Sequence, residues 1–217
     1  MKKIAAVLFD LDGTLLDTAP DLGFALNCLR KEEGLAPLPL ISYRPIISQG
    51  ANGLLKHALN IEEDHENYQR VREHFLSYYQ KHLADNSRLF PNMETMLSYL
   101  NERAIPWGIV TNKYAQYTNA LLTALPLPYQ PQCLVCGDTL STYKPNPAPL
   151  LFAAELLQQS PENCLYVGDA LTDVIASKAA GMQSIVAMYG YLGTEDKPLE
   201  WAADGYINDP MEVIAWL

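Results

Sequence analysis

Short and nearly continuous apolar runs recur along the chain and predict buried β-strands. They span residues 4–9, 107–111, 133–137, 164–168 and 184–188. A strand that is covered on both faces of its sheet needs such a run. Helical patterns lie between them, at residues 93–104, 116–125, 149–159 and 173–181. Alternating strands and helices indicate an α/β fold with a doubly wound parallel sheet, in which the carboxyl ends of all strands share one edge.

The alternation is interrupted after the first strand. Residues 18–86 contain no convincing strand, and their pattern predicts helices at 19–34, 49–60 and 67–84. We therefore expect a small α-helical domain at residues 17–86, inserted into a core made of residues 1–16 and 87–217. The hinges of this insert are expected near residues 16–18 and 84–88.

Polar side chains follow four of the five predicted strands. Because the carboxyl ends of parallel strands converge, we expect these side chains to lie close together. The set comprises Asp10 and Asp12 after the first strand, Thr111 and Asn112 after the second, Lys144 after the third, and Asp169 and Asp173 after the fourth. A single feature of this kind is often only a turn, but four in succession are typical of a catalytic site.

The chemistry that suits this set is phosphoryl transfer. An ionised Asp10 can attack phosphorus and form an acyl phosphate. Asp12 is placed to protonate the leaving oxygen and then to deprotonate the hydrolytic water. Asp10 and Asp169 offer the oxygen ligands that Mg²⁺ prefers, with Asp173 as a further ligand or as support for the others.

The phosphoryl group also needs donors of positive charge and hydrogen bonds. We expect Thr111, Asn112 and Lys144 to hold its oxygens. Lys144 matters most, because the chain of 217 residues has a formal net charge of −10. The same charge argues against a nucleic acid or an anionic membrane as partner.

Composition also bears on where the protein acts. No apolar run approaches the roughly 20 residues that span a bilayer. The N-terminal apolar run is interrupted by Asp10 and Asp12, so we interpret it as a strand rather than a secretion signal. We expect a cytoplasmic protein, monomeric or homodimeric, that acts on a small phosphorylated metabolite.

Four segments together resemble the motifs of the haloacid dehalogenase-like (HAD) hydrolase superfamily. They are DLDGTLLD (10–17), IVTN (109–112), YKPNPAP (143–149) and VGDALTD (167–173). The resemblance covers essentially the whole chain. It implies a helical cap after the first motif and an aspartyl-phosphate mechanism, with Asp10 as nucleophile and Asp12 as acid and base. It also implies that Thr111 and Lys144 hold phosphate, and that Asp169 and the main-chain carbonyl of Asp12 bind Mg²⁺.

Within this superfamily, an aspartate at position 12 fits phosphatases and phosphomutases rather than dehalogenases. The segments LLDTAPDL (15–22) and YGYLGTEDKPLEWAAD (189–204) resemble phosphoglycolate phosphatases of proteobacteria. That group contains a branch acting on N-acetylmuramic acid 6-phosphate, and the motifs do not separate the two. The resemblance implies hydrolysis of 2-phosphoglycolate, with N-acetylmuramic acid 6-phosphate as the alternative substrate.

The cap is expected to decide between these substrates. Arg44 is a candidate partner for a substrate carboxylate. Gly50 would allow the cap backbone to approach the substrate closely. Two rival functions remain, those of a sugar phosphomutase and of a non-enzymatic phospho-receiver domain.

Overall fold

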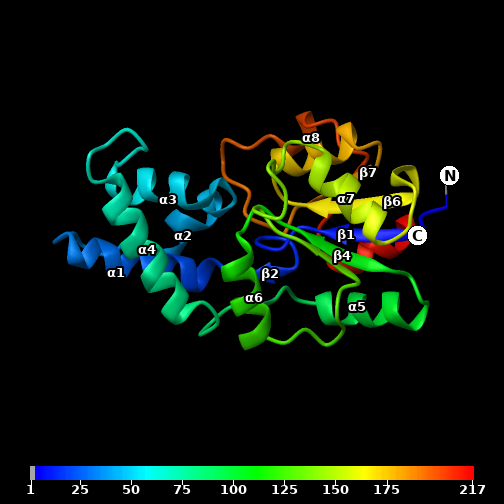
Figure 1. The fold of residues 1–217 in the computed structure, drawn as a ribbon, viewed down its shortest axis with the longest axis horizontal. Helices are drawn as coiled ribbons and strands as arrows, with labels where there is room; N and C mark the ends of the chain where they lie inside the picture. The colour runs from blue at the N-terminus through cyan, green and yellow to red at the C-terminus, as the bar shows by residue number, and fades with distance from the viewer. Residues whose placement is uncertain (1–2) are drawn as a thin grey trace.

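Six parallel strands form the central sheet of the structure, a computed structural model that describes residues 3–217 (Figure 1). Every neighbouring pair of strands is parallel. The order across the sheet is β5 (Cys133–Val135), β4 (Trp107–Val110), β1 (Ala6–Phe9), β6 (Cys164–Gly168), β7 (Gln183–Ala187) and β8 (Gly205–Ile207). The α/β class and the five predicted strands are confirmed. The sixth, β8, was missed because an apolar pattern over three residues does not stand out.

Helices cover both faces of the sheet. On one face lie α5 (Met93–Glu102) and α6 (Ala115–Ala124), and on the other lie α7 (Ala148–Leu156) and α8 (Leu171–Ala179) (Figure 1). Alternate residues of β1 serve the two faces, because successive side chains of a strand point in opposite directions. Val7 and Phe9 belong to the core under α5, whereas Ala6 and Leu8 belong to the core under α7. The sheet is therefore buried on both sides, as its unbroken apolar strands predict.

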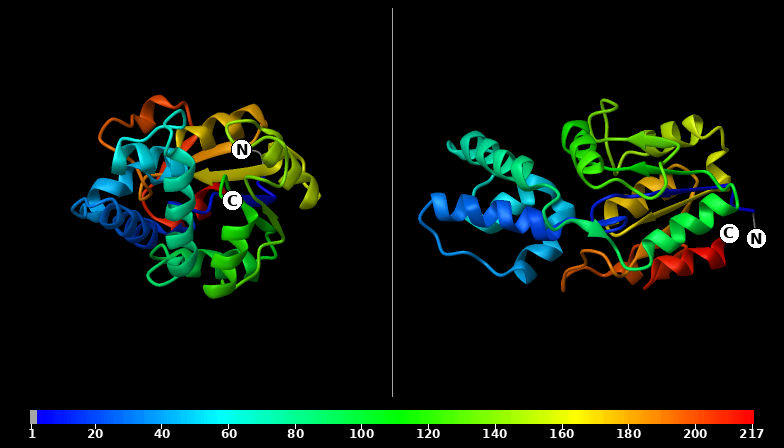
Figure 2. Two further views of the ribbon diagram at one scale, coloured as in Figure 1. Left: turned by 60° about the vertical axis from the view of Figure 1, so that its left-hand side comes forward. Right: turned by 90° about the horizontal axis from the view of Figure 1, so that it is seen from below.

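Four helices and one 3₁₀ segment lie beyond the carboxyl edge of the sheet (Figures 1 and 2). They are α1 (Ala19–Glu32), α2 (Leu40–Tyr43), η1 (Arg44–Gln49), α3 (Gly50–Leu59) and α4 (Tyr68–His82). α1 and α4 lie side by side. We call residues 19–82 the cap helices. The segment with α2 and η1 was not predicted, since Pro39 and Pro45 break the apolar period there.

Two short strands, which the sequence did not indicate, join the cap helices to the core. β2 (Leu16–Asp17) pairs with β3 (Arg88–Leu89) in antiparallel fashion. Asp21, at the start of α1, is fully buried and accepts hydrogen bonds from the backbone N–H groups of Asn86 and Ser87 at 2.8–3.0 Å. The two chain segments that join the core to the cap helices, one at β2 and one at β3, are therefore hydrogen-bonded to each other. They lie where the hinges were expected.

Short 3₁₀ segments complete the core. They are η2 (Pro161–Asn163), η3 (Pro198–Glu200) and η4 (Pro210–Trp216). Among residues 3–217, none of the helices combines the length and the apolar character that crossing a membrane requires.

Candidate active site

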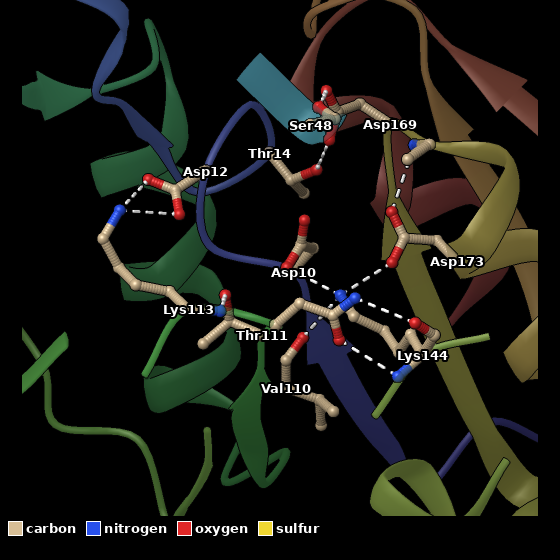
Figure 3. Close-up of polar contacts among 12 residues, drawn as sticks. Asp10, Asp12, Thr14, Ser48, Val110, Thr111, Lys113, Lys144, Asp169 and Asp173 are labelled. Carbon is tan, nitrogen blue, oxygen red and sulfur yellow. Dashed lines mark hydrogen bonds and ion pairs between the residues drawn. The ribbon is translucent and has the colours of Figure 1, made fainter. Parts of the chain in front are cut away.

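Lys144 is the centre of a buried polar network at the carboxyl ends of β1, β4 and β6 (Figure 3). Its Nζ lies 2.7 Å from Oδ1 of Asp10 and 2.7 Å from Oδ1 of Asp173. The same Nζ donates to the carbonyl of Val110 at 3.0 Å and to the hydroxyl of Tyr166 at 2.8 Å. Only 2% of the residue is exposed. Burial alone would lower the pKa of Lys144, but the charges of Asp10 and Asp173 outweigh it and hold the pKa above its usual value.

Asp10, Asp169 and Asp173 form a compact acidic cluster, of which Asp10 and Asp173 contact this lysine. One carboxylate oxygen from each lies within 4.8 Å of the others, and all three residues are buried. Burial raises the pKa of Asp10 to about 7, against the effect of Lys144. Burial also raises the pKa of Asp169 to about 8, and the charges of Asp10 and Asp173 add to this rise. Three carboxylates this close exceed the single charge of Lys144, so the cluster suits a divalent cation with oxygen ligands.

Backbone structure fixes two members of the cluster. The N–H of Asp10 donates to the carbonyl of Val167 at 2.9 Å, so Asp10 continues the register of β1 beside β6. Asp173 lies in the first turn of α8, and its Oδ2 accepts from the N–H of Ala170 at 3.1 Å. A carboxylate at this position is favoured by the free N–H groups of a helix start.

Asp169 is held from three directions. Its Oδ1 accepts from the hydroxyl of Thr14 at 3.2 Å, and its Oδ2 accepts from the N–H of Tyr191 at 2.8 Å. The third donor is Ser48 of η1, whose hydroxyl lies 3.1 Å from Oδ2 (Figure 3). The cap helices therefore contact the acidic cluster directly. Gly13 allows the turn after β1 to lie directly against Asp169. Its φ is +89°, and a Cβ at this position would lie 2.2 Å from Oδ2 of Asp169.

Asp12 points away from the acidic cluster, toward Lys113 (Figure 3). The Nζ of Lys113 lies 2.7 and 2.8 Å from the two carboxylate oxygens, and the hydroxyl of Thr18 donates to one of them. Burial alone would lower the pKa of Lys113, but the charge of Asp12 outweighs it and raises the pKa above its usual value. The structure thus separates the two carboxylates of the first motif, with Asp10 in the cluster and Asp12 beside it.

A cavity of about 360 Å³ opens between this edge of the sheet and the cap helices. Asp10, Asp12, Thr111, Asn112, Lys144 and Asp173 line it from the core side. Six of the sequence-predicted residues are therefore gathered at one cavity, and Asp169 is hydrogen-bonded to Ser48, which also lines it.

Comparison with known proteins agrees with this geometry. Residues 7–187 match the family described as haloacid dehalogenase-like hydrolase. The chain belongs to this family. Over 214 residues it is 39% identical to a phosphoglycolate phosphatase of Xanthomonas campestris, covering 97% of this chain and 96% of the relative. Over 212 residues it is 35% identical to the N-acetylmuramic acid 6-phosphate phosphatase of Pseudomonas aeruginosa, covering 98% and 94%.

A solved structure shows the same fold at similar length. The crystal structure of a predicted phosphoglycolate phosphatase from Haemophilus somnus superposes with a TM-score of 0.88 at 26% identity, covering 100% of this chain and 99% of the other. The expected enzyme class, a hydrolase of phosphoric monoesters, is confirmed by these relatives. Membership in a hydrolase family also removes the phospho-receiver domain from the rival functions.

In this HAD hydrolase the side chains of Thr111 and Asn112 have different neighbours. The hydroxyl of Thr111 accepts from the N–H of Lys113 at 3.1 Å and lines the cavity. The amide of Asn112 instead holds the backbone of Lys144, with bonds of 2.9 and 3.0 Å to its carbonyl and its N–H. The side chain of Asn112 is therefore occupied in positioning Lys144, and the predicted role of both residues toward phosphate stays a prediction.

The two cap residues singled out from the sequence also differ. Gly50 lines the cavity, and its φ of +69° allows the turn from η1 into α3. Arg44 is not among the residues that line the cavity. Its guanidinium pairs with Asp17 at 2.9 Å and stacks over the ring of Tyr191 at 5.0 Å. Arg44 thus connects η1 to β2, the strand that leads from the core into the cap helices.

Several residues that shape the site have no role in the sequence prediction. Lys113 is one of them, although it follows Thr111 and Asn112 in the polar end of the second predicted strand. Ser48, Tyr166 and Tyr191 carried no local signal, because each reaches the site only through packing of a distant element.

Proposed function

We propose that this HAD phosphatase is Mg²⁺-dependent and hydrolyses small phosphomonoesters through an aspartyl phosphate on Asp10. The observation that supports this most is the position of the Asp10 carboxylate. It lies at the cavity, held by Lys144, in one oxygen cluster with Asp169 and Asp173. The donor set is entirely oxygen, as Mg²⁺ prefers.

The side chains divide the reaction into two steps. In the first, an oxygen of Asp10 attacks phosphorus, the bond from phosphorus to the leaving oxygen breaks, and Asp12 gives that oxygen a proton. In the second, Asp12 takes a proton from water, which attacks the same phosphorus and frees Asp10 and inorganic phosphate. Asp10, Asp169 and the main-chain carbonyl of Asp12 would hold Mg²⁺, with Asp173 as a further ligand or as support. The charge of the ion would reduce the repulsion between the Asp10 carboxylate and the phosphoryl oxygens.

The first candidate substrate is 2-phosphoglycolate, which is supported by the name of the Xanthomonas relative. N-acetylmuramic acid 6-phosphate is the second candidate. It is favoured by the cavity of about 360 Å³, which lies within the range of pockets for larger ligands and exceeds the needs of a two-carbon acid. Both substrates carry a carboxylate on the leaving group.

We extend the proposal to the surroundings of the site. Residues 17–86 serve as the cap domain of a core made of 1–16 and 87–217. The protein acts in the cytoplasm as a monomer or homodimer, without a nucleic-acid or membrane partner. Its net charge of −10 supports the last point.

Phosphate release from a substrate panel tests the proposal. The panel contains 2-phosphoglycolate, N-acetylmuramic acid 6-phosphate and common sugar phosphates, ranked by kcat/KM. We expect turnover of an acidic phosphomonoester with Mg²⁺ present, and none in Asp10→Asn, whose circular dichroism should match the wild type. Isomerisation of a sugar phosphate without phosphate release would favour the phosphomutase instead.

A further inference from the structure

One cation on the cavity wall has no carboxylate partner among residues 3–217. The cavity is lined by three cationic side chains, those of Lys113, Lys144 and Arg72. Lys113 pairs with Asp12, and Lys144 pairs with Asp10 and Asp173. Arg72 takes part in none of the ion pairs found among residues 3–217. It is half-buried and faces a space that a ligand can enter.

The position of Arg72 on α4 sets its distance from the chemistry. Arg72, Phe75, Leu76 and Tyr79 all line the cavity, as residues spaced three or four apart on one helix face do. The ring of Tyr79 lies 5.0 Å from the Nζ of Lys113, so this end of the face adjoins Asp12. Seven residues of helix place Arg72 about 10 Å further along the axis. Arg72 therefore lines the cavity at a distance from the Lys113–Asp12 pair, where the rest of a leaving group has room.

We infer that Arg72 binds a carboxylate on the leaving group and thereby gives the enzyme a preference for acidic phosphomonoesters. This inference rests on the proposed phosphatase function. The guanidinium can hold a carboxylate with two parallel hydrogen bonds. A chain with a formal charge of −10 and an acidic catalytic cluster repels a second anionic group, unless a cation is placed to receive it.

Arg44, the cation favoured by the sequence, is a poorer partner. Its guanidinium is already bound to both oxygens of Asp17, at 2.9 and 3.0 Å, and packs on Tyr191. Binding a substrate there would break a partly buried pair outside the cavity. Arg72 can bind a substrate carboxylate without breaking any of the ion pairs found among residues 3–217.

The test compares two phosphates that differ in one acidic group. N-acetylmuramic acid 6-phosphate carries a lactyl ether that N-acetylglucosamine 6-phosphate lacks. The panel is completed by 2-phosphoglycolate and p-nitrophenyl phosphate, whose leaving group has no carboxylate. The variants are Arg72→Gln and Arg72→Lys. The matched control is Arg70→Gln, because Arg70 lies on the same helix but is exposed and pairs with Glu33.

We expect Arg72→Gln to lower kcat/KM for the preferred acidic substrate about 10- to 100-fold, the value of one charged hydrogen-bonded contact. The loss should fall mainly on KM, because Arg72 holds the substrate away from the reacting atoms. Turnover of p-nitrophenyl phosphate should stay unchanged. Arg72→Lys should recover part of the loss, and Arg70→Gln should match the wild type on every substrate.

Two results would overturn the role of Arg72 alone. One is an equal loss on acidic and non-acidic substrates, and the other is an unchanged preference for acidic ones in Arg72→Gln. A wild-type enzyme that hydrolyses none of the four phosphates would instead overturn the proposed function, and the role of Arg72 with it.

Discussion

Replacing Lys144 by methionine should destabilise the core, because the lysine neutralises charge that is otherwise trapped. The substitution keeps an unbranched apolar stem and removes the terminal ammonium group. Asp10 and Asp173, both bound at 2.7 Å, are then left buried without their partner. Tyr166 and Val110 still satisfy each other, through a hydrogen bond of 2.9 Å. The perturbation is therefore mainly electrostatic.

The expected loss of unfolding free energy is about 3–5 kcal/mol, the usual cost of leaving one partner of a buried ion pair alone. The matched control is Lys178→Met. Lys178 also pairs with an aspartate, Asp204, at 2.8 Å, but 43% of its side chain is exposed. An exposed pair of this kind contributes about 0–1 kcal/mol.

Urea unfolding, followed by circular dichroism, measures both losses. EDTA should be present, so that no divalent cation replaces the missing charge. The midpoint for Lys144→Met should fall by about 1–2 M. A loss no larger than that of Lys178→Met would refute the view that Lys144 is the main compensating charge of the cluster.

Three further predictions concern the chemistry of the site. EDTA should abolish phosphate release and added Mg²⁺ should restore it, whereas turnover that persists in EDTA would count against a metal at Asp169. Asp12→Asn should lower kcat about 10²- to 10⁴-fold in steady-state assays, because the general acid and base is lost, and an unchanged kcat would remove Asp12 from the mechanism. Gly13→Ala should weaken Mg²⁺ binding in titration calorimetry. The added Cβ would lie 2.2 Å from Oδ2 of Asp169 and would therefore displace that carboxylate. Wild-type affinity in that variant would show that the turn after β1 does not position Asp169.

The sheet and the convergence of its motifs could be predicted from the sequence, because both follow from local patterns. Apolar runs mark buried strands, and parallel strands bring their carboxyl ends to one edge. These patterns alone predict that Asp10, Thr111, Lys144 and Asp169 belong to one site. The short pair β2 and β3 has two residues in each strand and offers no period to detect.

Contacts between the cap helices and the core could not be predicted in this way. Ser48 reaches Asp169 across 121 positions of sequence, and Tyr191 donates to the same carboxylate from the loop after β7. Neither follows from local periodicity, since both depend on how distant elements dock.

Which cap arginine can bind a substrate carboxylate also depends on how the cap helices dock. Arg72 lies next to the apolar positions Val71, Phe75 and Tyr79, which face inward on α4. The sequence analysis singled out Arg44 alone, and only the docked structure shows that Arg72 lines the cavity and that Arg44 is occupied by Asp17.

The covalent role of Asp10 can be measured by quenching the Mg²⁺-loaded enzyme with acid during turnover and mapping phosphoryl groups by mass spectrometry. A phosphoryl group is predicted on the peptide that contains Asp10, removable by hydroxylamine as an acyl phosphate and absent from Asp10→Asn. A phosphoryl group on any other residue, or phosphate release by Asp10→Asn at the wild-type rate, would contradict the account.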